Sequence, residues 1–297
     1  MSTVMLSFPD DLALATAVAA RLGARRGRLD WRHFPDGESL VAIDEDLAGD
    51  EVVLFSSLND ADRKALPLRL AADTAREFGA RRVGLVAPYL GYLRQDARFH
   101  RGESISARSF ARFLDQGLDW LVTVDPHLHR IATLGQVLRM PATAVAAAPL
   151  LAQWIRDEVD RPMLIGPDSE SEQWVAEVAR LAGVSHQVLR KQRHGDREVE
   201  VSLPDPGLLR GHTPVLVDDI ASTGRTLLAT LAHLQPLQLP AAVCVVIHPL
   251  FAGGAWQELQ RAGAGRIVST DSIAHPSNAI SLAAPIAEAV AAQLGPG

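Results

Sequence analysis

Short apolar runs alternate along the chain with longer segments in which apolar residues recur every three or four positions. The short runs are typical of buried strands, and the longer spacing is typical of helices with one apolar face. The runs predict strands at Val4–Phe8, Val52–Ser56, Val83–Ala87, Trp120–Val124, Met163–Gly166, His186–Leu189, Val215–Val217 and Ala242–Ile247. The longer segments predict helices at Leu12–Leu22, Leu66–Phe78, Ile105–Leu114, Ala148–Val159, Gln173–Leu181, Thr226–Leu234 and, in an Ala-rich tail, Leu282–Leu294.

This alternation predicts an α/β protein with mostly parallel sheets flanked by helices and joined by right-handed crossovers. The pattern runs twice, and the stretch from Pro141 to Pro149 is rich in small residues, as linkers are. We therefore expect one domain at residues 1–145 and a second at 146–297, with the last helix as a candidate to pack back on the first domain. Ligands bind at the carboxyl ends of the strands in such sheets, so polar residues that follow strands are candidate site residues.

The strongest such candidate follows the strand at Val215–Val217. Two carboxylates, Asp218 and Asp219, come first, and the turn into the next predicted helix is polar. That turn carries hydroxyl groups and a glycine, at Ser222, Thr223, Gly224 and Thr226. Amides at a helix N-terminus bind phosphate, and carboxylates can hold sugar hydroxyls or a metal ion. The stretch suggests a sugar phosphate held at both ends; an ordinary strand–turn–helix junction with capping acids is the alternative.

Two further segments carry groups that suit a nucleotide. After the strand at Val83–Ala87, the run Arg94-Gln95-Asp96 begins a basic stretch with interleaved aromatic residues, and arginine can grip phosphate oxygens and stack on a base. A solvated basic loop is the alternative. The segment Phe34-Pro35-Asp36-Gly37-Glu38 reads as a turn whose ring could stack on a purine and whose acids could accept from an amino group. A plain Pro–Asp–Gly turn is the alternative there.

Four more polar residues lie near predicted strand ends. His127 and Asp168 each come shortly after a strand, where a histidine can sit near a metal or a phosphate. Lys191 and Arg193 belong to a basic stretch that could close over a polyphosphate and neutralise charge in the transition state. Capped or solvent-exposed loops are the alternatives for all of these.

Composition narrows the class of protein. The chain has 297 residues, 47% of them hydrophobic and 22% charged, which is normal for a soluble globular protein. Its net charge of −6 argues against nucleic-acid binding through bulk charge. Cys244 is the only cysteine and lies in an apolar run, so we expect a buried thiol and a reducing compartment. With neither a long apolar run nor a basic leader, the sequence predicts a cytoplasmic protein that binds no membrane.

In this order the motifs resemble those of the ribose-phosphate diphosphokinase family, the synthetases of phosphoribosyl diphosphate (PRPP). The resemblance runs from about Phe34 to Ser272 and implies two tandem phosphoribosyltransferase-like domains. It implies transfer of diphosphate from ATP to the C1 hydroxyl of ribose 5-phosphate, with Mg²⁺ as cofactor and PRPP and AMP as products. It also implies a homo-oligomer whose sites are shared between subunits.

The resemblance assigns roles by position. The ATP-binding residues are Phe34, Asp36, Glu38, Arg94, Gln95 and Asp96. The metal-side residues are His127 and Asp168, and the catalytic residues are Lys191 and Arg193. The ribose 5-phosphate residues are Asp218, Asp219, Ser222, Thr223, Gly224 and Thr226. Many relatives have a Gly–Gly pair after the acid at position 168, whereas Glu170 and Ser171 intervene here, and the stretch from Arg98 to Glu103 looks more like archaeal-type members.

Two rival functions stay open at this point. A phosphoribosyltransferase would consume PRPP through the same phosphate loop, but it does not need the basic segment at Arg94–Asp96 or a doubled domain. A non-catalytic, synthetase-like regulatory subunit would need no intact catalytic pair, whereas this sequence keeps Lys191 and Arg193.

Overall fold

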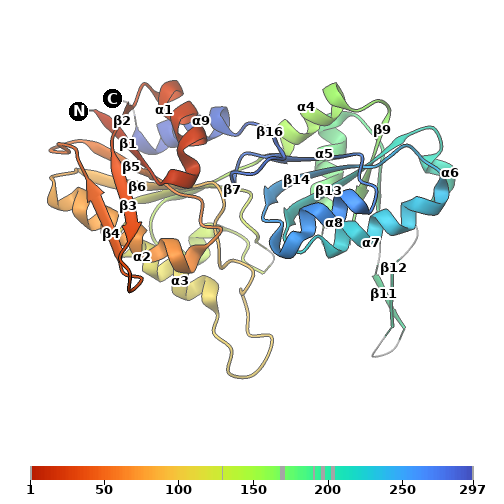
Figure 1. The fold of residues 1–297 in the computed structure, drawn as a ribbon, viewed down its shortest axis with the longest axis horizontal. Helices are drawn as coiled ribbons and strands as arrows, with labels where there is room; N and C mark the ends of the chain where they lie inside the picture. The colour runs from red at the N-terminus through yellow and green to blue at the C-terminus, as the bar shows by residue number, and fades with distance from the viewer. Residues whose placement is uncertain are drawn as a thin grey trace. The chain divides into compact units, whose positions relative to one another are not determined.

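A computed structural model describes residues 2–128, 130–167, 171–189, 191–194, 198–201 and 205–295, with 191–194 and 198–201 described by their backbone. The chain divides into two compact units (Figure 1). Unit 1 comprises Met1–Val145, Ser272–Ala274 and Leu282–Gly297, and unit 2 comprises Ala146–Asp271 and His275–Ser281. Among the described residues, no helix is both long and apolar enough to cross a bilayer.

Unit 1 is built on a parallel six-stranded sheet in the order β2-β1-β5-β6-β7-β8, with a separate antiparallel hairpin of β3 and β4. Its strands are β1 Thr3–Ser7, β2 Arg25–Arg26, β3 Leu29–His33, β4 Ser39–Ile43, β5 Glu51–Phe55, β6 Arg82–Ala87, β7 Trp120–Val124 and β8 Ala142–Val145. Its helices are α1 Leu12–Leu22, α2 Ala61–Glu77, α3 Ser106–Asp115 and α9 Ala283–Leu294.

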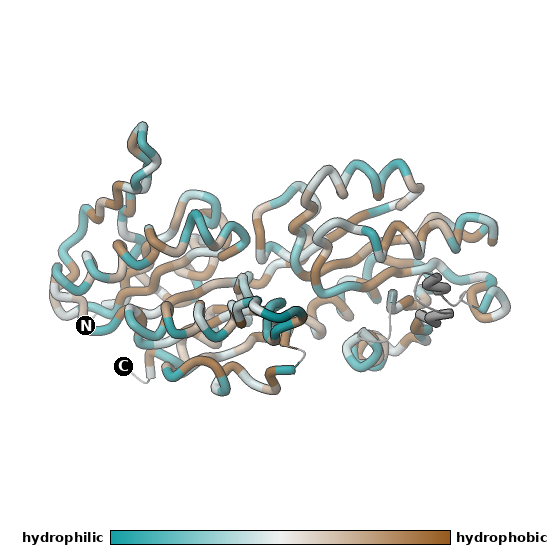
Figure 2. The backbone as a smooth tube through the Cα atoms, turned by 90° about the horizontal axis from the view of Figure 1, so that it is seen from below, coloured by the Kyte–Doolittle hydropathy of each residue, from teal (hydrophilic) through white to brown (hydrophobic). Residues whose placement is uncertain are grey.

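The central strands of this sheet are apolar because helices cover both faces. Every residue of β5 and β7 is buried, as expected for parallel strands that lack a solvated face. The hydropathy colouring in Figure 2 shows these strands in brown inside the unit. One position admits only glycine: a Cβ added at Gly84 in β6 would lie 1.9 Å from the ring of Trp120, which is fully buried.

The C-terminal helix belongs to unit 1 although most of unit 2 precedes it in sequence. Helix α9 packs against α1 and lies over β7 and β8, and Figure 1 shows the blue helix beside the red one. The side chain of Gln293 donates to Thr143 Oγ1 of β8 at 2.8 Å. The first unit is therefore completed by the end of the chain.

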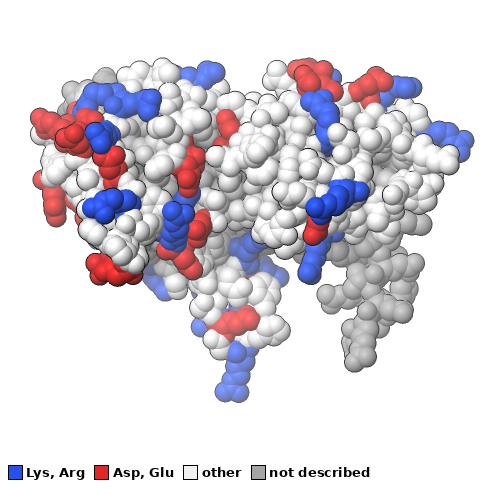
Figure 3. Space-filling model, viewed as in Figure 1, with Lys and Arg blue, Asp and Glu red and all other residues white. Residues whose placement is uncertain are grey.

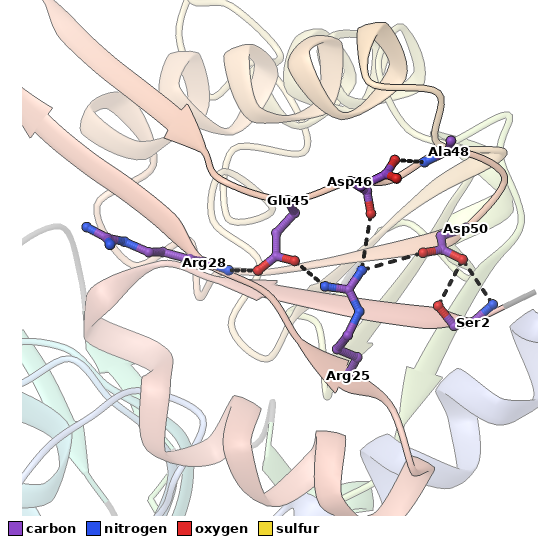
Figure 4. Close-up of polar contacts among 7 residues, drawn as sticks. All are labelled: Ser2, Arg25, Arg28, Glu45, Asp46, Ala48 and Asp50. Atoms are coloured by element: carbon purple, nitrogen blue, oxygen red, sulfur yellow. Dashed lines mark hydrogen bonds and ion pairs between the residues drawn. The ribbon is translucent and has the colours of Figure 1, made fainter.

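Charged side chains close the β2 edge of this sheet (Figure 4). The Arg25 guanidinium pairs with Glu45, donates to the Asp46 carbonyl at 3.2 Å and lies 3.6 Å from Asp50. Asp50 in turn accepts from the amide of Ser2 at 3.0 Å. Because an exposed edge strand can pair with another chain, a two-residue edge rich in arginine protects against such pairing.

Unit 2 has a parallel six-stranded sheet in the order β10-β9-β13-β14-β15-β16 and a two-stranded antiparallel ladder of β11 and β12. Its strands are β9 Pro162–Gly166, β10 His186–Val188, β11 Lys191–His194, β12 Glu198–Val201, β13 Thr213–Ala221, β14 Val243–Pro249, β15 Arg266–Thr270 and β16 Asn278–Ile280. Its helices are α4 Ala148–Glu158, α5 Glu172–Ala182, α6 Pro206–Leu209, α7 Arg225–Leu234 and α8 Ala255–Arg261.

The predicted α/β class is confirmed, and most of the predicted elements are present within a few residues. The linker prediction was wrong in part: Ala142–Val145 forms β8, an edge strand parallel to β7, and α4 begins at Ala148. Small and β-branched residues suffice for an edge strand because little packs on its outer side. Helix α2 begins at Ala61 rather than Leu66, and Pro67 lies inside it, so its polar first turn was missed.

Candidate functional site

Strand β13 carries the predicted acid pair within its length rather than after it. Asp218 and Asp219 are both half-buried, and the strand continues to Ala221 because Ile220 and Ala221 still pair with β14. The prediction that the strand ends at Val217 was therefore wrong. Since successive side chains of a strand point to opposite faces, the two carboxylates leave the sheet on opposite sides.

The turn after β13 leads into an uncapped helix N-terminus. Gly224 adopts a left-handed conformation with φ of 66°, which a glycine tolerates without strain, and α7 begins at Arg225. No side chain caps this helix, so the first amides of α7, including that of Thr226, have no partner within the helix. Backbone amides and the helix dipole at such an end attract phosphate. Ser222 and Thr223 lie in the same turn, half-buried and exposed, respectively.

Cys244 lies beside the acid pair but does not present a reactive thiol. It is fully buried in β14, as predicted, at the position that pairs with Leu216 of β13. Burial, together with the smaller effect of the nearby Asp218 carboxylate, raises the pKa of this thiol to about 12. The cysteine therefore stays protonated and acts as an apolar core residue.

In unit 1 the predicted aromatic turn is confirmed as the tip of the β3–β4 hairpin. The Phe34 amide donates to the Glu38 carbonyl at 2.7 Å, and the Asp36 side chain accepts from the Glu38 amide at 3.2 Å. Gly37 takes a φ of 92°. The ring of Phe34 is exposed, with the guanidinium of Arg32 at 4.7 Å from its centre. An exposed aromatic ring on a fixed turn is suited to stacking.

The Arg94–Asp96 segment lies within the loop that joins β6 to α3, seen as the projecting pale yellow loop of unit 1 in Figure 1. Arg94 is exposed, Gln95 is half-buried and Asp96 is buried. The Asp96 carboxylate accepts from the amide and the guanidinium of Arg130, at 3.1 and 2.9 Å. Burial opposes ionisation of Asp96, but these bonds outweigh it, and the net effect is a lowered pKa. Asp96 thus holds the loop as well as lying next to Arg94.

The remainder of the loop is organised around Glu103, which the sequence did not single out as a site residue. Its carboxylate accepts from the amides of Phe99 and His100 at 2.9 and 3.0 Å and from Gln95 Nε2 at 3.1 Å. Arg98 donates to its carbonyl at 2.9 Å. In the space-filling view, Lys and Arg side chains lie along this projection (Figure 3). The loop therefore carries exposed basic side chains, and the hydrogen bonds of the Glu103 carboxylate hold its backbone in place.

Helix α2 lies between the hairpin and this loop. A groove of about 460 Å³ separates α2 from the hairpin and is lined by Glu38 and Asp62, among others. A second groove, of about 390 Å³, lies on the other side of α2 and is lined by Asp62, Tyr92 and Phe110. The Tyr92 hydroxyl donates to Asp62. The two predicted ATP-side segments thus flank one helix of the same unit.

The remaining predicted residues are described less fully. His127 lies in the loop after β7 and is half-buried. Asp168 lies outside the described residues. Lys191 and Arg193 belong to β11, where they pair with Val201 and Val199 of β12, and only their backbone is described. Within the described ranges, no three or more His, Cys, Asp or Glu side chains gather closely enough to hold a metal ion.

Comparisons with known proteins agree with this architecture. A family model for the N-terminal domain of ribose phosphate pyrophosphokinase matches residues 3–117, and one for the phosphoribosyl transferase domain matches residues 133–280. A ribose-phosphate pyrophosphokinase of Methanopyrus kandleri is 34% identical, over 97% of this chain and 98% of the relative. One of Halobacterium salinarum is 35% identical, over 97% and 100%. The phosphoribosylpyrophosphate synthetase of Mycobacterium smegmatis shares the fold, with a TM-score of 0.86 and 24% identity over 99% of each chain.

Proposed function

Because this chain belongs to the ribose-phosphate pyrophosphokinase family, we propose that its unit 1 residues bind ATP and its unit 2 residues bind ribose 5-phosphate. The chain is an enzyme of PRPP synthesis. In the proposed reaction, the C1 hydroxyl oxygen of the sugar attacks the β-phosphorus of ATP. A bond forms between that oxygen and the β-phosphorus, and the bond between the β-phosphorus and the oxygen that bridges it to the α-phosphate breaks. AMP leaves with the bridging oxygen, and the hydroxyl proton is released to water.

The end of β13 supports the sugar side of this proposal more directly than any other feature. Its half-buried carboxylates suit hydrogen bonds from ribose hydroxyls, and because Asp218 and Asp219 leave the sheet on opposite sides, one of them would make most of the contacts with the sugar. The uncapped N-terminus of α7 follows at the distance of one short turn and suits the 5-phosphate. Ser222, Thr223, Gly224 and Thr226 would surround that phosphate with hydroxyl and amide donors.

The ATP side would be formed by the two segments that flank α2. Arg94 is exposed and can grip phosphate oxygens, and Gln95 lies beside it on a backbone held by Asp96 and Glu103. The ring of Phe34 would stack on an adenine, with Asp36 and Glu38 as acceptors for its amino group. Lys191 and Arg193 would stabilise the diphosphoryl group during transfer, since such reactions need positioning and charge neutralisation above all.

The chain fits a Mg²⁺ ion that arrives with ATP. Mg²⁺ keeps several waters and commonly takes one or two protein ligands plus substrate phosphates, so it needs no cluster of protein ligands. Asp168 and His127 are the proposed protein contacts. When bound, the ion would supply charge neutralisation on the phosphate oxygens.

We also propose that the enzyme is a homo-oligomer and acts in the cytoplasm. The Phe34 ring at the tip of the hairpin is exposed. Among the described residues, the guanidinium of Arg32 lies over this ring and no aromatic ring packs on it. A tip of this kind can complete the site of a neighbouring subunit. Both proposed substrates are phosphorylated metabolites of the cytoplasm. Activity that persists in an isolated monomer at high dilution would contradict the shared site.

The first experiment is direct. The purified protein is incubated with ATP, Mg²⁺ and ribose 5-phosphate, and AMP and PRPP are measured together. We expect equal amounts of both products. An absence of product despite binding of both substrates would instead indicate a regulatory subunit. An absence of ATP binding would favour a phosphoribosyltransferase, which a screen of bases with PRPP would reveal.

The catalytic assignment is tested by Lys191→Ala. We expect kcat to fall by several orders of magnitude with little change in ATP affinity, because a charge that acts in the transition state contributes little to ground-state binding. The matched control is Arg180→Ala, which removes an exposed cation of α5 that pairs with Glu177 three residues earlier. Unchanged turnover in Lys191→Ala would remove this residue from the mechanism.

A further inference from the structure

Three aromatic rings of unit 2 pack together next to the turn that follows β13. The ring of Phe251 lies 5.3 Å from that of Trp256 and 4.8 Å from that of His275, and the Trp256 and His275 rings are also 4.8 Å apart. Phe251 is buried and Trp256 and His275 are half-buried. We call these three residues the aromatic cluster. Its packing serves no part of the mechanism described so far.

The backbone of Phe251 is unusual for a bulky residue. Its φ and ψ are 38° and 48°, in the left-handed region that side chains with a Cβ rarely adopt. Such a conformation persists only where the surroundings enforce it, and it points to a functional constraint. The rings of Trp256 and His275 hold the Phe251 side chain from two directions and so fix its backbone.

This strained backbone is bonded directly to the phosphate turn. The amide of Phe251 donates to the Ala221 carbonyl at 2.8 Å, and the amide of Ala252 donates to the Ser222 carbonyl at 2.9 Å. In a trans peptide the carbonyl and the following amide point in opposite directions. Holding the Ser222 carbonyl therefore directs the Thr223 amide away from residue 252, towards the open side of the turn.

His275 is itself held in one orientation. Its Nδ1 atom accepts from the Ser277 amide at 3.2 Å and lies 2.8 Å from the Ser277 hydroxyl, and its own amide donates to the Asn278 side chain at 2.9 Å. An Nδ1 atom that accepts from an amide carries no proton, so the geometry places the ring proton on Nε2. Burial lowers the pKa of His275, in keeping with a neutral ring.

Helix α8 adds a second support under the same turn. A Cβ at Gly224 would lie 3.3 Å from Ala255 and 3.5 Å from Leu259, so the turn rests closely on this helix. Trp256 follows Ala255 directly, and its ring packs on both other members of the aromatic cluster. The cluster thus reaches the turn by two routes, through backbone hydrogen bonds and through the start of α8.

We infer that Phe251, Trp256 and His275 are positioning residues, which hold the turn so that its amides face the 5-phosphate of the sugar. This role rests on the proposed function of the turn. It involves no contact with ATP. Disturbing the cluster should therefore weaken the use of ribose 5-phosphate and leave the use of ATP unchanged, a division that general loss of structure would not produce.

The test measures KM for each substrate in His275→Ala. We expect KM for ribose 5-phosphate to rise about tenfold, the ratio that corresponds to about 1.4 kcal/mol. KM for ATP should change less than about twofold, within ordinary variation for a site that is untouched. His275→Phe keeps a ring against Phe251 and Trp256 and should restore most of the affinity. His275→Gln keeps a polar group without the ring and should not.

A matched control and a second variant complete the design. Trp154→Ala removes an aromatic residue of the same unit, whose ring faces Arg266 at 4.8 Å, and should leave both KM values unchanged. Trp256→Ala, at a half-exposed position, decides the matter if His275→Ala does not fold. If the wild-type protein makes PRPP and the folded variants His275→Ala or Trp256→Ala have the wild-type KM for ribose 5-phosphate, the positioning role alone is overturned. Wild-type protein that makes no PRPP would instead overturn the proposed function.

Discussion

A buried lysine in unit 1 offers a quantitative test of the fold. Lys64 of α2 is 1% exposed, and its Nζ atom donates to the Ser57 carbonyl at 2.9 Å and to Asn59 Oδ1 at 2.8 Å, and lies 3.3 Å from Asp10. The nearby carboxylate of Asp11 is also buried and accepts from the Ser57 amide at 3.0 Å. Lys64→Met keeps much of the side-chain volume and removes the charge together with its hydrogen bonds.

The expected cost depends on pH through Asp11. Burial raises the pKa of Asp11 from 3.8 to about 6, and the charge of Lys64 acts in the opposite direction and limits the rise. Between these two values the folded state binds more protons than the unfolded state, so stability falls as pH increases through this window. The ionised carboxylate thus costs the wild-type protein about 3 kcal/mol at pH 8, from a pKa difference of about two.

Without Lys64, the ionised Asp11 would lose its nearest cation. At pH 8 we expect Lys64→Met to lower the free energy of unfolding by about 3–5 kcal/mol, as when one partner of a buried ion pair is removed. At pH 5 Asp11 is mostly protonated, and the loss is limited to the two hydrogen bonds of the ammonium and its ion pair with the exposed Asp10, at about 1–3 kcal/mol. The double variant Lys64→Met with Asp11→Asn should be more stable than Lys64→Met at pH 8 and show little of this pH dependence.

Because the chain has two units, the readout must be local to unit 1. Hydrogen exchange measured on peptides from β5 gives the free energy of opening next to Ser57 at both pH values. The control is Arg28→Met, which breaks the exposed ion pair with Asp30 and should leave the free energy of opening nearly unchanged at both pH values. Equal losses at pH 5 and pH 8 in Lys64→Met would refute the coupling between Lys64 and Asp11.

The structure also predicts the effects of three other substitutions. Gly84→Ala places a methyl group 1.9 Å from the buried ring of Trp120 and should destabilise unit 1 by about 3 kcal/mol or more, measured by denaturant unfolding. Gly224→Ala forces an alanine to φ of 66° and towards α8, and should raise KM for ribose 5-phosphate about tenfold at unchanged KM for ATP. Asp96→Asn removes the charge that holds Arg130 and should speed proteolysis of the loop before α3. Because the pKa of Asp96 is lowered, the proteolysis rate of the wild-type protein should rise towards that of the variant only when the pH falls below the ordinary range of a carboxyl.

The sequence predicted the parts of this fold that depend on local pattern. Apolar runs such as Val83–Ala87 and Trp120–Val124 became central strands because parallel strands buried on both faces have no polar alternation. The turn between β13 and α7 was also predictable as a turn, since acids, hydroxyls and a glycine occur there in a fixed order. The edge strand β8 was not, because it is made of small residues that little else in the sequence distinguishes from a linker, whereas the edge strand β10 was predicted.

Contacts between residues far apart in the sequence could not be predicted from local patterns. Arg130 binds Asp96, which is 34 positions away, and no feature of the sequence around either residue indicates this pair. In the sequence, Lys64 looks like a surface residue in the polar first turn of a helix, but the structure buries it. Its partners Ser57 and Asp10 follow β5 and β1, two strands that are brought together only by the sheet. The burial of Lys64 could have been predicted only from a model of the sheet that shows which side chains of the first turn of α2 face it.

The two units also show how one topology supports two different uses of the same loop. Their sheets have matching strand orders, so the loop after β5 in unit 1 corresponds to the loop after β13 in unit 2. In unit 1 that loop is closed by its own chain, because the Ser57 amide is bonded to Asp11 and the Ser57 carbonyl to Lys64. In unit 2 the corresponding loop has its carbonyls held from behind, by Phe251 and Ala252, and ends in the uncapped helix α7. Bonding the Ser57 amide to a carboxylate leaves that amide unavailable to a phosphate in unit 1. In the described part of the chain, the corresponding turn of unit 2, which we propose binds the sugar phosphate, has backbone partners that are amides and carbonyls rather than carboxylates, and it leads into the first amides of α7.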